Sequence, residues 1–148
     1  MSNKNNKKHK EHEKPNKSYY SLPKADYNSI VILWADGWYD WFLCGPIEIS
    51  GKRYYATCVD DRGHREKGNW YRRYVILELP KEVWDEIIGR HEFFVEKVGD
   101  HFVFENGNRK REGLKKDSTW HEFYDRYPTD KYTKISEDYY PIIGWFEV

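Results

Sequence analysis

Carboxylates next to aromatic rings are the first candidates for chemistry in this chain. Residues 34–42 hold three Trp, one Tyr, one Phe and two Asp around a glycine. Asp36 and Asp40 lie on either side of two of these rings, and glycoside hydrolysis uses a pair of carboxylates. Asp36-Gly37 is also typical of a tight turn, where both residues serve the backbone. A small enzyme that uses Asp36, Asp40 or His121 is therefore one of three hypotheses about function.

Histidines and cysteines do not complete a site of known type. His91 and Glu92 begin like the zinc helix of a metalloprotease, but Val95 stands where the second histidine is required. His91 also falls on an apolar stripe, which is typical of a core histidine. No basic residue near Cys44 in the sequence would lower its thiol pKa, and Cys58 fits ordinary packing. Because no phosphate loop or nucleophile elbow occurs either, we expect no catalytic residues of a known class, no metal ligands and no cofactor.

Aromatic residues and arginines form the strongest pattern. Protein interfaces favour Trp, Tyr and Arg, and the chain has 7 Trp and 13 Tyr. Seven tryptophans are hard to bury completely in so small a domain, so some rings are expected at the surface. The preferred hypothesis is a non-enzymatic module that binds a protein partner. Its predicted contact residues are Trp38, Tyr39, Trp41, Trp70, Tyr71 and Arg72.

Rings that alternate with cations on a sheet face also suit single-stranded nucleic acid, which stacks its bases on aromatic side chains. The chain lacks a ribonucleoprotein-type motif, and its folded part is expected to be acidic, so this is the alternative hypothesis. It would use Arg53, Tyr55, Arg72 and Tyr74.

Charge divides the chain into a tail and a domain. Residues 1–24 carry a formal charge of +5 and the remainder carries −5. The first segment is low in complexity and in apolar residues, which predicts a disordered basic tail over 1–24 and a single domain over 25–148. No signal peptide is apparent, and no apolar run approaches the roughly 18 residues of a membrane span. We expect a cytoplasmic protein with reduced thiols.

Apolar runs and turn signals predict the elements that position these residues. Strands are expected at 30–34, 42–49, 53–59 and 72–79, with later strands at 102–105 and 139–148. Gly45-Pro46 should place a bulge in the second strand or put that strand at an edge. Helices are expected at 80–98 and 119–126, and charged loops at 60–70 and 108–117. This order predicts an α+β fold, in which the long helix packs on an antiparallel sheet of four to six strands.

One further pattern extends over roughly residues 38–125. It consists, in order, of Tyr39-Asp40, Gly45-Pro46, Gly51-Lys52-Arg53-Tyr54-Tyr55, Arg72-Arg73-Tyr74, Leu79-x-x-Glu82-x-Trp84 and Trp120-His121-x-Phe123-Tyr124. In this order the chain resembles small uncharacterised soluble proteins of bacteria and of their phages or mobile elements. The resemblance implies a small soluble domain and transfers no activity, cofactor or site residue.

Overall fold

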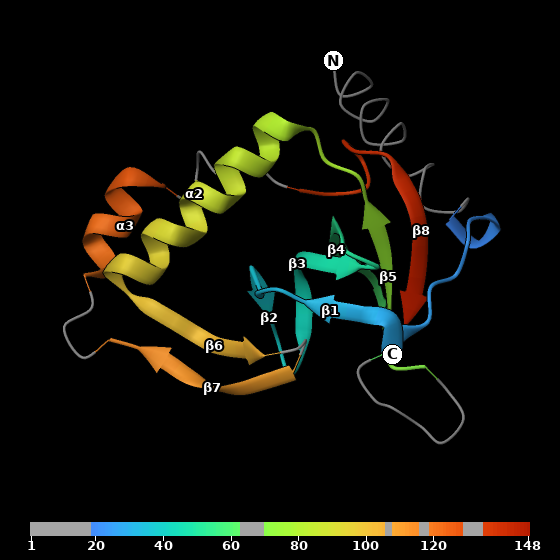
Figure 1. Cartoon of the computed structure of the whole chain (residues 1–148), viewed down its shortest axis with the longest axis horizontal. Helices are drawn as coiled ribbons and strands as arrows, with labels where there is room; N and C mark the ends of the chain where they lie inside the picture. The colour runs from blue at the N-terminus through green and yellow to red at the C-terminus, as the bar shows by residue number, and fades with distance from the viewer. Residues whose placement is uncertain (1–18, 63–69, 106–107, 116–118, 129–134) are drawn as a thin grey trace, which may run out of the picture.

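An antiparallel sheet and two helices confirm the predicted α+β fold. The computed structural model describes residues 19–62, 70–105, 108–115, 119–128 and 135–148 (Figure 1). The main sheet has six strands in the order β1-β3-β4-β5-β8, with β2 paired to β3. Its strands are β1 Ile30–Ile32, β2 Gly37–Trp38, β3 Phe42–Ile49, β4 Lys52–Asp61, β5 Arg72–Leu77 and β8 Ile142–Glu147. Before them, the short 3-10 helix η2 covers Tyr27–Ser29.

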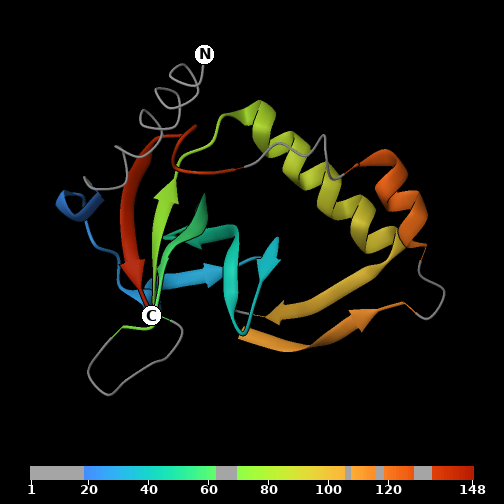
Figure 2. The ribbon, with the colours of Figure 1, turned by 180° about the vertical axis from the view of Figure 1, so that it is seen from behind.

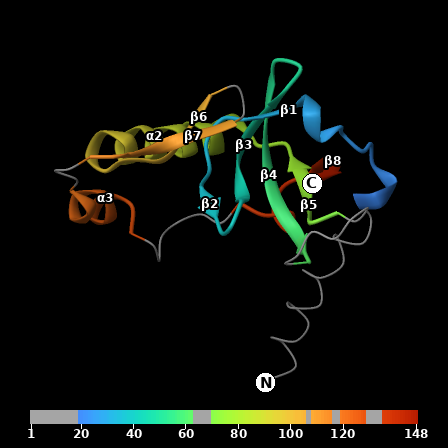
Figure 3. The ribbon, with the colours of Figure 1, turned by 90° about the horizontal axis from the view of Figure 1, so that it is seen from below.

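The remaining elements form a second group beside the sheet. They are the helix α2 Lys81–Lys97, the hairpin of β6 Gly99–Glu105 and β7 Asn108–Leu114, and the helix α3 Trp120–Arg126. Figures 1 and 2 show α2, α3 and the β6–β7 hairpin together at one end of the molecule, with the main sheet at the other. The view from below shows the same separation (Figure 3). Any cavity where the two groups meet therefore draws its walls from both.

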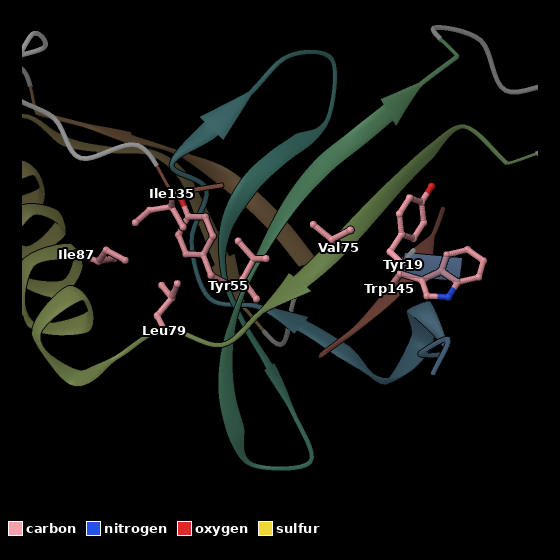
Figure 4. Packing of buried hydrophobic residues seen from close by; sticks show 8 residues of the cluster. Tyr19, Tyr55, Val75, Leu79, Ile87, Ile135 and Trp145 are labelled. Atoms are coloured by element: carbon pink, nitrogen blue, oxygen red, sulfur yellow. The ribbon is translucent and has the colours of Figure 1, made fainter. Parts of the chain in front are cut away.

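Alternating side chains give the sheet two apolar faces. Along β4, Tyr55 belongs to one buried cluster and Ala56 to the other, as the period of two predicts. Figure 4 shows the first cluster, in which Ile87 and Ile135 lie near Tyr55, while Tyr19 and Trp145 lie at the far end. The second cluster holds Phe42, Tyr74 and Phe146, among other side chains.

Helix α2 packs against the first cluster along its apolar stripe. Ile87 is buried there, and the Trp84 ring lies 6.5 Å from the ring of Tyr55. Pro80 precedes the first turn, where its missing N–H needs no partner. Among the described residues, no helix is both long and apolar enough to cross a membrane.

Proline in β3 does not place this strand at an edge. β3 pairs with β4 on one side and with β1 and β2 on the other. The Pro46 carbonyl accepts a hydrogen bond from the Leu33 N–H, so the missing Pro46 N–H faces the stretch between β1 and β2. The irregularity predicted at Gly45-Pro46 is therefore in the segment beside β3. There, residues 33–36 leave the sheet between β1 and β2.

Two predicted assignments differ most from the structure. Residues 108–114 form the strand β7 and not a charged loop, because local hairpin pairing with β6 needs no apolar alternation. Residues 19–24 belong to the fold and not to a tail, since Tyr19 is 4% exposed and Lys24 forms an isolated parallel β-bridge with Trp145. The rest of the predicted tail, residues 1–18, lies outside the described residues. Cys44 and Cys58 are free thiols.

Candidate functional site

Arg72 organises the loop that carries the predicted contact rings. Its guanidinium donates hydrogen bonds to the carbonyl oxygens of Tyr39 and Trp41, the latter at 3.1 Å. Its Nε forms an ion pair with Asp61 Oδ2 at 3.1 Å, and its Cζ lies 4.9 Å from the centre of the Tyr71 ring. The two segments predicted to form one surface thus meet at this side chain. Arg72 itself is 1% exposed, so the prediction that it contacts a partner directly is wrong.

Three of the predicted rings lie on the loop that Arg72 holds. Tyr39 is 68% exposed, whereas Trp38 and Trp41 are half-buried with ring centres 5.3 Å apart. Asp40 has a φ of 58°, in the left-handed region that aspartate tolerates better than most residues. We call Trp38, Tyr39, Trp41 and Tyr71 the tip surface.

Trp70 is not part of the tip surface. Its ring lies between two guanidinium groups, 3.9 Å from Cζ of Arg62 and 4.0 Å from Cζ of Arg73. Arg72 and Arg73 are neighbours on β5 and therefore face opposite sides of the sheet. Because it contacts Arg73, Trp70 lies on the face of the sheet opposite to the face of Arg72.

The residues predicted to stack nucleic-acid bases do not form an open face. Tyr55 is 1% exposed and Tyr74 is 0% exposed, and each hydroxyl donates a hydrogen bond inside the protein, to Asp36 and to the Phe42 carbonyl respectively. Burial raises the pKa of the Tyr74 hydroxyl. Arg53 is exposed, but its guanidinium lies over the Trp84 ring at 5.5 Å. The buried rings are unavailable for base stacking in this conformation.

The three residues of the enzyme hypothesis do not converge. Asp40 and His121 are exposed, while Asp36 is half-buried and lines a cavity of about 200 Å³. This cavity lies where residues 35–36 meet α2, α3 and β6. We call it the Asp36–His91 pocket, and its polar and aromatic lining includes Asp36, Arg90, His91, Asp100, Trp120 and Tyr124.

Trp34 contacts two titratable groups of the pocket, Asp36 and His91. Its Nε1 donates a hydrogen bond to Asp36 Oδ1 at 3.0 Å, and its ring stacks on the His91 imidazole at 4.0 Å and 5°. The Tyr55 hydroxyl donates to the other oxygen, Asp36 Oδ2, at 2.9 Å. The carboxylate and the imidazole are therefore held by one indole, although 55 positions separate them in the sequence.

Burial dominates the electrostatics of the pocket. It raises the pKa of the Asp36 carboxyl, against the hydrogen bonds from Tyr55 and Trp34 and the positive charge of Arg90. It lowers the pKa of His91 to about 4, with help from Arg90, so the imidazole is neutral at pH 7. Burial and the nearby Asp36 charge raise the pKa of Cys44 to about 11, so the thiol is protonated at neutral pH.

Sequence reasoning missed His91 as a site residue, because its place on the apolar stripe of α2 indicated ordinary packing. No signal in the sequence pairs it with Asp36. Within the described ranges, no group of three or more His, Cys, Asp or Glu side chains is arranged to hold a metal ion. Comparisons with protein-family models, with curated proteins and with solved structures gave no match.

Proposed function

We propose that this chain is a non-enzymatic module that binds a protein partner through the tip surface. The observation that carries the proposal is the set of Arg72 hydrogen bonds to the Tyr39 and Trp41 carbonyls. These bonds fix the backbone of a loop whose most exposed ring is Tyr39. A rigid aromatic anchor loses little conformational freedom on binding, which is why such residues dominate binding energies.

The neighbouring rings suit the edge of such a contact. Trp38 and Trp41 are half-buried, so they retain apolar area that a partner can cover. The setting we propose is the cytoplasm, where the free thiols of Cys44 and Cys58 stay reduced.

Photo-crosslinking tests the proposal. With p-benzoylphenylalanine at position 39, we expect the chain to crosslink to one discrete protein in the cells that express it. The matched control is position 139, because Tyr139 is also a strongly exposed tyrosine, at 61% against 68% for Tyr39.

The purified partner then allows a measurement of affinity. Tyr39→Ala should weaken binding at least about tenfold, as expected for a hot-spot aromatic, while Tyr139→Ala should not. The tip surface would not be the binding site if positions 39 and 139 crosslinked equally to the same protein, or if Tyr39→Ala bound the partner as tightly as the wild type.

A further inference from the structure

The Asp36–His91 pocket offers hydrogen-bonding groups that the fold does not use. Carboxylate oxygens provide about four acceptor sites in total, and the Trp34 and Tyr55 donors occupy two of them. His91 stacks on Trp34 through its ring face, and its ring nitrogens form no hydrogen bond with another described residue. A neutral imidazole presents one N–H donor and one acceptor. Both groups are held in fixed orientations by the same indole.

Charge in the lining argues against a strongly charged ligand. Asp36 and Asp100 would attract a cation and repel an anion, and Arg90 would do the reverse, so any ionic ligand meets at least one group of its own sign. A neutral ligand that carries both donors and acceptors meets no such penalty. It can donate to the carboxylate and exchange hydrogen bonds with the imidazole.

Shape restricts the ligand further. The cavity of about 200 Å³ is smaller than the roughly 300–1,000 Å³ of pockets for drug-sized ligands, so it suits a single ring system. Phe94, Trp120 and Tyr124 contribute aromatic wall, in which the Trp120 and Tyr124 rings stack on each other with centres 6.2 Å apart. Aromatic walls favour a ligand with flat apolar faces and a polar edge.

We propose that the Asp36–His91 pocket binds a neutral planar nitrogen heterocycle of nucleobase size, with Asp36 accepting from a ring N–H or amino group and His91 bonding the adjacent polar atom. The pocket uses none of the tip-surface residues, so this function is additional to partner binding.

Free bases provide direct probes. Adenine, hypoxanthine, cytosine and uracil would be titrated into the full chain by calorimetry, with binding confirmed by saturation-transfer NMR. Glucose, benzoate and benzamidine serve as comparators, because they are a non-planar neutral ligand, a planar anion and a planar cation. At least one base should saturate the protein at millimolar concentration or below, and bind more tightly than all three comparators.

Two variants separate the site from its surroundings. Asp36→Asn removes the charged acceptor with little change of shape, and His91→Phe keeps a ring on Trp34 but removes both nitrogens. Each should weaken base binding by about tenfold or more, whereas Asp40→Asn, an exposed acid of the same segment, should bind like the wild type.

His91→Phe keeps the test decisive if Asp36→Asn does not fold, since the stacking ring is retained. The proposal is overturned if no base saturates the protein, if a comparator binds more tightly than every base, or if folded His91→Phe binds bases like the wild type.

Discussion

At the scale of single residues, the structure assigns unexpected roles to two charged or titratable side chains. Arg72 was predicted to contact a partner and instead supports the loop that carries Tyr39. His91 was predicted to be a core histidine, and it is indeed stacked and half-buried, yet it lines a cavity. Residue type and spacing predicted neither set of contacts. The contacts depend on pairings between distant segments.

His91 should make stability depend on pH. Its pKa of about 4 lies below the ordinary value of 6.5, so between these values the unfolded chain binds more protons than the folded one. Its contribution to the free energy of unfolding is therefore present above about pH 6.5 and is lost as the pH falls toward 4. Urea denaturation at several pH values should show a weaker loss for His91→Phe than for the wild type.

Asp36 contributes in the opposite direction, because its raised pKa means that the folded state retains the proton to higher pH. The comparison with His91→Phe keeps this contribution in place, so the difference between the two proteins isolates the histidine. If the free energy of unfolding fell equally steeply with falling pH in the wild type and in His91→Phe, the pH dependence would not come from His91.

At the scale of elements, β3 was predicted with its actual bounds, Phe42–Ile49, because its apolar run is closed by the Ser50-Gly51 hairpin turn. β7 was missed, since its charged sequence has no apolar alternation that would predict a strand. The pocket was missed for a different reason. Asp36 and His91 line one pocket because residues 33–36 leave the sheet and helix α2 packs back against it.

Gly45 permits that departure from the sheet. A Cβ atom at this position would lie 2.3 Å from the Trp34 carbonyl oxygen, a backbone atom that cannot rotate away. Gly45→Ala should therefore lower the free energy of unfolding by about 2 kcal/mol or more and displace Trp34 from Asp36. Chemical denaturation would measure the loss of stability, and the NMR signal of the Trp34 indole N–H would report its displacement from Asp36.

Gly51→Ala is the matched control. Gly51 has a φ of +80°, but a Cβ there would meet nothing within 4 Å, so only the backbone cost of about 1 kcal/mol is expected. Equal losses in the two variants would show that crowding at Trp34 is not the cause.

At the scale of the whole molecule, residues 19–25 hold the final strand in place. The Tyr19 ring packs at 5.6 Å from Trp145, and Trp145 Nε1 donates a hydrogen bond to the Leu22 carbonyl. The Ala25 N–H donates to the Trp145 carbonyl at 2.8 Å. The predicted tail boundary at residue 24 failed because two adjacent tyrosines within a polar segment give no periodic signal.

Tyr19→Ala tests this arrangement. Removing a side chain that is 4% exposed should lower the free energy of unfolding by about 3 kcal/mol, through lost burial and the cavity left behind. Tyr139→Ala, at an exposed tyrosine, should change it by less than about 0.5 kcal/mol. Denaturation midpoints that shift equally in both variants would contradict a structural role for Tyr19.

The position of β8 also has a consequence for how the chain folds. β8 pairs with β5, and their contact between Arg73 and Glu147 joins residues 74 positions apart. During synthesis, β5 emerges well before its partner and presents a mostly apolar strand with an unpaired edge. Such long-range pairing is slow and leaves the edge open to other chains. We therefore expect nascent chains that lack β8 to aggregate or to require a chaperone until residues 142–147 have left the ribosome.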